Sequence, residues 1–121
     1  MRRISVALVV LALLLVIAAS AIMLPKVSIT SGVEQYSGEE RTFAAYALKQ
    51  TDLLVGGSIE PLMIVARHVD EIQRTGDQGS CGYEPFLVNH QYQATVKLYT
   101  FFGQEYGFVS VDCSDAHIRR N

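Results

Sequence analysis

The sequence predicts an α+β fold: an N-terminal hydrophobic helix, then a two-helix hairpin packed on a three-stranded antiparallel meander, with one disulfide. Three patterns in the 121 residues support it. Residues 4–24 are apolar and uncharged, residues 38–74 repeat their apolar positions at helical spacing, and residues 86–113 alternate between apolar and polar. A period near 3.6 residues favours a helix, and a period of two favours a half-buried strand.

The first 25 residues resemble an export segment, because Arg2 and Arg3 precede an uncharged apolar run. In one interpretation a signal peptide is cleaved after Ala19-Ser20-Ala21, where the residues are small. In the other, Ile4 to Leu24 stays as a transmembrane anchor, since about 20 residues span a hydrocarbon core. Both interpretations place the rest of the chain outside the cytoplasm, because arginines hold the N-terminus inside.

The remainder divides into a spacer at residues 26–36 and a small extracytoplasmic α+β domain at residues 37–121. Its charge is mixed and slightly acidic, and Arg119-Arg120 is its one adjacent basic pair. A protein that binds nucleic acid usually carries a basic stripe or cluster. We therefore expect no nucleic acid among its partners, and we expect contact with a membrane through Ile4 to Leu24 if that run is uncleaved.

Two cysteines, Cys81 and Cys113, lie in the exported part. Paired cysteines are common in small domains of oxidising compartments. The sequence therefore predicts a disulfide that closes a loop of about 33 residues.

Two helices are expected first in the domain. Ser37 and Glu40 form a capping box that starts a helix at 38–55, and Gly56-Gly57 ends it. Ser58 can cap a second helix at 59–74. The expected buried stripes are Phe43, Ala47 and Leu54 on the first helix, and Ile59, Leu62, Met63, Ala66, Val69 and Ile72 on the second.

Three strands should follow, at residues 85–88, 92–102 and 105–113. A three-residue loop at 89–91 joins the first pair. Gly103 stands at the first central position of a two-residue turn, which is typical of a type II′ hairpin. In that register Leu98 pairs with Val109, Val96 with Val111 and Ala94 with Cys113, so that one face of the meander is apolar.

The same register gathers four aromatic residues on the other face at the hairpin tip. They are Tyr99 opposite Phe108, and Phe101 opposite Tyr106. Exposed aromatic patches often mark interfaces, although cross-strand aromatic pairs also stabilise sheets. We expect this tip to bind an unknown protein or ligand at the cell surface.

The expected function is a non-catalytic binding or structural module, either anchored in the membrane or secreted. The alternative is a small extracytoplasmic hydrolase that uses His68 or His90 with a carboxylate. No cofactor motif is present, and no catalytic residue is assigned. Asp112, Cys113, Asp115 and His117 resemble metal ligands in composition. Neighbouring strand residues point to opposite faces, however, and we expect the chain after Ser114 to be a mobile tail, so no metal site is expected.

Overall fold

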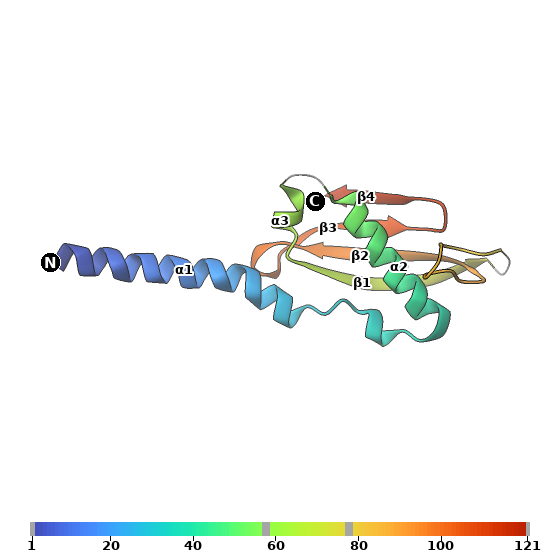
Figure 1. Ribbon diagram of the computed structural model, residues 1–121, viewed down its shortest axis with the longest axis horizontal. Helices are drawn as coiled ribbons and strands as arrows, with labels where there is room; N and C mark the ends of the chain where they lie inside the picture. The colour runs from blue at the N-terminus through green and yellow to red at the C-terminus, as the bar shows by residue number, and fades with distance from the viewer. Residues whose placement is uncertain (1, 57–58, 77–78, 121) are drawn as a thin grey trace.

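A long helix projects from one end of a four-stranded sheet that a second helix covers (Figure 1). The computed structural model describes residues 2–56, 59–76 and 79–120. The α+β class, the apolar N-terminal helix and the disulfide are confirmed. The helices are α1 (Arg2–Ser28), η1 (Val33–Gln35), α2 (Gly38–Leu54), α3 (Glu60–Met63) and η2 (Phe101–Gly103), and the strands are β1 (Ala66–Gly76), β2 (Gln91–Tyr99), β3 (Glu105–Val111) and β4 (Ala116–Arg120).

Helix α1 contains the apolar run and continues beyond it. It passes through Pro25, the last residue of the expected export segment, and the Ile29 amide still donates to the Pro25 carbonyl at 2.8 Å. Ala21 and Pro25 are buried, whereas most of the helix is exposed. By length and composition α1 can cross a membrane, and it is the one helix of this kind among the described residues.

The predicted spacer is partly structured. After α1 ends, the chain follows the edge of β1, where the Val69 amide donates to the Ser31 carbonyl at 2.8 Å and Gln35 Nε2 donates to Val69 O. Gly32 has a left-handed backbone, and a Cβ there would lie 2.7 Å from Val69 O. Glycine is therefore required for this close approach, which covers an otherwise open sheet edge.

Helix α2 matches the first predicted helix to within a residue. Phe43, Ala47 and Thr51 form its buried stripe, while Leu54 is exposed, contrary to expectation. Ser37 is the N-cap residue, but its side chain makes no capping hydrogen bond.

The predicted second helix at 59–74 is wrong, because α3 is only one turn long and residues 66–76 form β1. The register of β1 against β2 shifts between Val69 and Glu71. This bulge lets Val69 and Ile72 both face the core although they are three residues apart. A bulged strand therefore reproduced the apolar spacing of a helix. Capping by Ser58 falls outside the described residues.

The sheet is an antiparallel meander in the order β1-β2-β3-β4, rather than the three-stranded one predicted. The predicted first strand, at 85–88, forms only an isolated bridge between Cys81 and Val88, and β1 takes its place beside β2. The sequence also misses β4, which pairs with β3.

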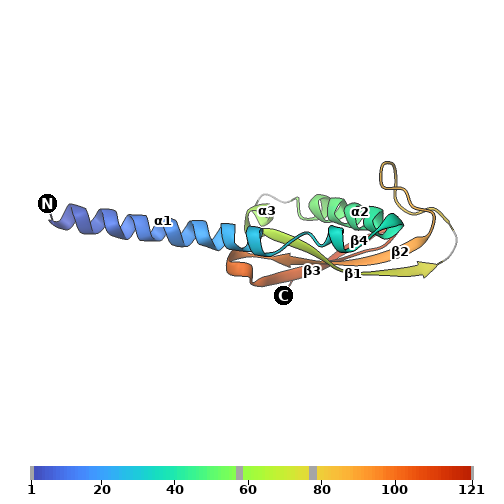
Figure 2. The same ribbon diagram turned by 90° about the horizontal axis from the view of Figure 1, so that it is seen from below.

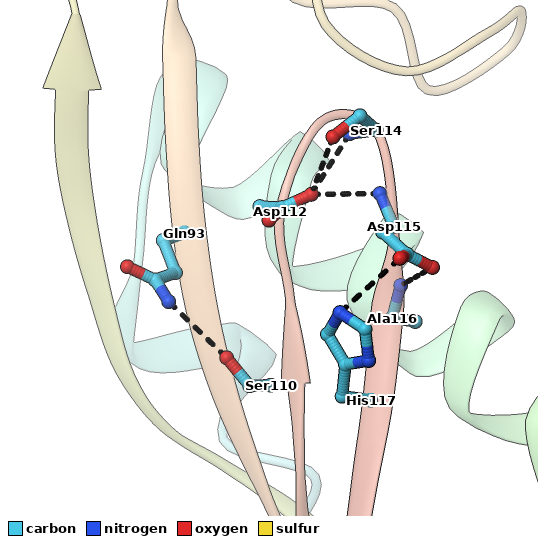
Figure 3. A network of polar contacts seen from close by, with 7 residues as sticks. All are labelled: Gln93, Ser110, Asp112, Ser114, Asp115, Ala116 and His117. Atoms are coloured by element: carbon cyan, nitrogen blue, oxygen red, sulfur yellow. Dashed lines mark hydrogen bonds and ion pairs between the residues drawn. The ribbon is translucent and has the colours of Figure 1, made fainter.

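A turn at residues 112–115 brings β4 back along β3 (Figure 3). Asp112 Oδ1 accepts hydrogen bonds from both the amide and the hydroxyl of Ser114, and from the Asp115 amide. An aspartate that binds the amides following it favours a turn. The residues after Ser114, expected to be a mobile tail, therefore form a strand.

The β2–β3 register differs by two residues from the prediction, because Val96 pairs with Val109 and Ala94 with Val111. The Thr100 amide donates to Gln104 O, so the turn is longer than two residues, and Phe102 adopts a left-handed conformation within it. The next pairs, Leu98 with Gly107 and Tyr99 with Glu105, skip Tyr106. A shift of two residues keeps every side chain on its face, so the predicted apolar face survives.

The core lies between α2 and one face of the sheet. Figure 2 shows α2 on this face and not on the opposite one. Phe43, Val69, Val96, Leu98 and Val109 are fully buried there. The Cys81–Cys113 disulfide, with its Cα atoms 5.0 Å apart, ties the loop before β2 to the end of β3.

Candidate functional site

The predicted aromatic tip is divided among three places. Phe101 lies in η2 beside α1, where both line one hollow. Tyr106 is the residue skipped at the bulge, and its hydroxyl donates to Glu60 of α3 at 2.6 Å. Tyr99 and Phe108 remain on the sheet face opposite α2, but Phe108 pairs with Lys97 rather than with Tyr99.

We call the sheet face opposite α2 the outer face. One row of paired residues crosses all four strands on this face: His68, Lys97, Phe108 and Arg119. Side chains directly opposite each other on neighbouring strands lie on the same face and in contact range. The half-buried ring of Phe108 is therefore flanked by two permanent cations.

Acidic and neutral polar groups surround this row. Asp70 lies 4.0 Å from Lys97 Nζ, and the next row contains Glu71, Thr95, Ser110 and His117. Gln93 Nε2 donates to Ser110 Oγ at 3.2 Å (Figure 3). The outer face is thus an aromatic side chain in a mixed-charge, hydrogen-bonding surface.

The sequence pattern predicts Phe108 as a site residue, but not Lys97 or Arg119. Lys97 does not stand out in the sequence, because it occupies one of the polar positions in the apolar–polar alternation. Arg119 was assigned to a tail. The signal that could have found it is the alternation of Ala116 and Ile118 with His117 and Arg119.

A second polar cluster joins α3 to the end of β4. Arg120 binds both carboxylate oxygens of Glu60, with Nη2 at 2.8 Å from Oε1, and Tyr106 binds the same carboxylate. The hydrogen bonds from Arg120 and then Tyr106 lower the pKa of Glu60 to about 2. All three side chains are hydrogen-bonded within the cluster, so it holds α3 against β4. We call Glu60, Tyr106 and Arg120 the clamp.

The clamp predicts acid sensitivity. The folded pKa of Glu60, about 2, lies below its ordinary 4.5, so its stabilisation is present above about pH 4.5 and is lost as the pH falls toward 2. Glu60→Gln should lower the urea midpoint of unfolding at pH 7. Between pH 4.5 and pH 2, the midpoint of this variant should fall less steeply than that of the unchanged protein. Equal declines for the two proteins would contradict the assignment.

The histidines proposed for a hydrolase lie apart. His68 Nδ1 contacts the Thr30 carbonyl at 2.8 Å, whereas His90 Nδ1 contacts Glu39 Oε1. Glu39 also accepts the Asn89 amide, and this bond is the main reason why its pKa is lowered. Because Glu39 binds both a backbone amide and a side chain of one bend, the pair anchors that bend to α2.

The residues that resemble metal ligands are used otherwise. Cys113 is bonded to Cys81, and His117 Nε2 pairs with Asp115 Oδ2 at 3.1 Å (Figure 3). Burial of Asp112 opposes its ionisation, but the bonds from Ser114 and Asp115 lower its pKa. Within residues 2–56, 59–76 and 79–120, no group of three or more histidine, cysteine or acidic side chains could hold a metal ion.

The fold and its surfaces define an α+β protein with one apolar N-terminal helix and a partly uncovered sheet. The sequence matches no protein-family model, no curated protein and no solved structure in the comparisons made with them. Function therefore has to be argued from the surfaces themselves.

Proposed function

We propose that this protein is a membrane-anchored, non-catalytic module that binds a protein partner outside the cytoplasm through the outer face of its sheet. The observation that carries the proposal is the row of Lys97, Phe108 and Arg119, on a face that no described helix covers.

The packing of α1 supports a retained anchor over a cleaved signal. The helix is unbroken across Ala19-Ser20-Ala21, and Ala21 is buried where α1 meets the domain. Cleavage after Ala21 would therefore divide the helix inside its own contact surface. The disulfide supports an oxidising compartment, in which such bonds persist.

The chemistry of the row supports a protein partner. Aromatic and arginine side chains are enriched among the residues that contribute most to protein binding. A carboxylate beside an apolar side chain on the partner would complement Phe108 between Lys97 and Arg119. Charge complementarity of this kind sets orientation and partner choice.

The anchor is tested on the expressed full chain. Intact mass of the membrane fraction should include residues 1–21, and alkaline carbonate should not extract the protein, because an apolar span partitions stably into lipid. A soluble product that starts at Ile22 would contradict the anchor and leave the sheet surface unaffected.

The binding face is tested with a photo-crosslinking amino acid at Gln93 on the outer face, and at Lys49 on exposed α2 as the matched control. Adducts with one partner are expected from position 93 only. Lys97→Glu with Arg119→Glu should remove them, because reversed charge repels the complementary surface. Adducts of equal yield from both positions, or adducts unaffected by the charge reversal, would refute the proposal.

The hydrolase is the second candidate, and the contact between His90 and Glu39 favours it. A carboxylate that orients a histidine is half of a general acid–base arrangement. The binding module is favoured because neither His90 nor Glu39 lines the nearby polar hollow, where a substrate would have to bind. That hollow is lined by Thr75, Ser80, Gln91, Tyr92, Asp112, Cys113 and Ser114.

A further inference from the structure

The turn between β2 and β3 lies along the last apolar turns of α1. Phe101 and Phe102 line one hollow together with Ala18, Ala21 and Ile22, and all five side chains are apolar. Toward the domain, Phe102 and Gly103 line a second hollow with Leu24, Pro25, Ser28 and Ile29, so the tip extends along α1 from the apolar run to the end of the helix. Figure 1 shows this contact as the point where the orange turn meets the blue helix. We call residues 101–103 the η2 tip.

The position of the η2 tip along α1 sets its depth in a membrane. A helix rises 1.5 Å per residue, so Ala18 lies about 9 Å closer to the bilayer centre than Leu24. The apolar run from Ile4 to Leu24 matches a hydrocarbon core of about 30 Å, which leaves Lys26 among the headgroups. Groups level with residues 18–22 are therefore below the headgroups.

We propose that the η2 tip inserts into the outer leaflet of the same bilayer that α1 spans, so that the partner of this surface is lipid. The inference rests on the proposed membrane anchor and adds a second, non-helical point of insertion. It also removes Phe101 from the protein-binding surface expected from the sequence.

The composition of the η2 tip suits this environment. Residues 100–104 contain no charged side chain, and Phe101 and Phe102 are 39% and 58% exposed although they are large and apolar. Burial of such rings in lipid is favourable, and their exposure to water is not. The polar Thr100 and Gln104 flank the tip on the side of the domain.

The backbone of Phe102 supports the same conclusion. Its φ is 60°, in the left-handed region where glycine or asparagine fits with least strain. Gly103, with a φ of 76°, already supplies the flexible residue of the turn. The backbone of the turn therefore does not favour phenylalanine at this position, and insertion of the ring into lipid would account for it.

A second apolar element lies at the same end of the domain. Ile59 and Leu62, next to and within α3, are 66% and 74% exposed. Figures 1 and 2 both place α3 at the end from which α1 leaves, on the other side of the sheet end from the η2 tip. Apolar groups at two separate points near the base of α1 would hold the domain in one orientation, with its strands pointing away from the membrane.

The depth of the η2 tip can be measured directly, because the chain contains no tryptophan. Phe102→Trp in the full chain, reconstituted in phosphatidylcholine vesicles, provides a single fluorophore. Leu14→Trp, in the middle of the apolar run, reports the anchor. Leu87→Trp, exposed in the loop before β2, is the control in water.

Quenching by lipids brominated at two acyl-chain depths separates the outcomes. The Phe102→Trp protein should emit at shorter wavelength than the Leu87→Trp protein and be quenched mainly by bromine near the carboxyl end. The Leu14→Trp protein should be quenched mainly by bromine deeper in the chain. If the anchor probe is quenched and the tip probe is not, the proposed insertion of the tip is overturned, while the membrane anchor stands. An unquenched anchor probe would overturn the anchor and, with it, the inference.

Tryptophan at a left-handed position could disturb the turn, so Phe101→Trp is the second probe. The same quenching pattern from position 101 supports insertion. Adding Phe102→Asn, which keeps the left-handed backbone, should weaken the quenching of this second probe because the tip loses apolar area. A probe at position 101 that is unquenched with either residue at position 102 would overturn the proposal.

Discussion

Replacing Phe43 with alanine is expected to lower the free energy of unfolding by about 3–5 kcal/mol, the usual cost of removing a fully buried aromatic side chain. Phe43 has no exposed surface, and its ring lies 5.5 Å from those of Tyr46 and Tyr92. It joins α2 to β2 at the centre of the core, so the cavity would be lined from both layers. A loss of this size is a large share of the stability of a small domain.

The measurement is urea unfolding of the full chain in detergent, followed by tyrosine fluorescence, which reports the domain while α1 stays helical. Leu53→Ala is the matched control on the same helix, since Leu53 is largely exposed. That control should change stability by less than about 0.5 kcal/mol. A loss below about 1 kcal/mol for Phe43→Ala would show that α2 does not pack on the sheet as described.

The elements predicted correctly are those in which one local pattern decides the structure. Helix α2 follows from an apolar stripe of one period, and the apolar faces of β2 and β3 follow from strict alternation. Strand β1 was missed because the bulge at Asp70 gives a strand the apolar spacing of a helix. Sequence alone does not show a bulge, which depends on pairing with β2.

The candidate site was limited by register and by the chain end. The type II′ turn expected at Gly103 left Phe102 as the last residue of a strand, whereas Phe102 lies in the turn with a left-handed conformation. The resulting shift of two residues places Lys97, rather than the expected Tyr99, opposite Phe108. Arg119 was missed because β4 has few buried side chains and depends on β3 for its hydrogen bonds.

The two proposed surfaces divide the sheet between different environments. The η2 tip is at the end near α1, while Lys97, Phe108 and Arg119 lie on the outer face between the sheet ends. If the tip is held in lipid, the outer face is oriented roughly parallel to the membrane normal. It is then open to a partner in the same compartment. Orientation by the tip would then reduce the rotational freedom that a tethered domain loses on binding.

Removing the disulfide with Cys81→Ala and Cys113→Ala is expected to lower the free energy of unfolding by about 3–4 kcal/mol, because the unfolded chain regains the freedom of a loop of about 33 residues. Both cysteines are replaced so that no thiol remains to link two molecules. Ser80→Ala, next to Cys81 and exposed, is the control and should leave stability unchanged.

The loss should begin locally, because Cys81 is joined to the rest of the fold by few backbone bonds. Among the described residues, its amide and carbonyl bond to Val88 alone, each at 2.9 Å, whereas β2 is paired on both sides. In the double variant, hydrogen exchange should therefore lose protection first at the amides of positions 81 and 88, with Val96 still protected. Simultaneous loss at all three amides, or a change in urea stability below about 1 kcal/mol, would show that the bond does not act by restraining this loop.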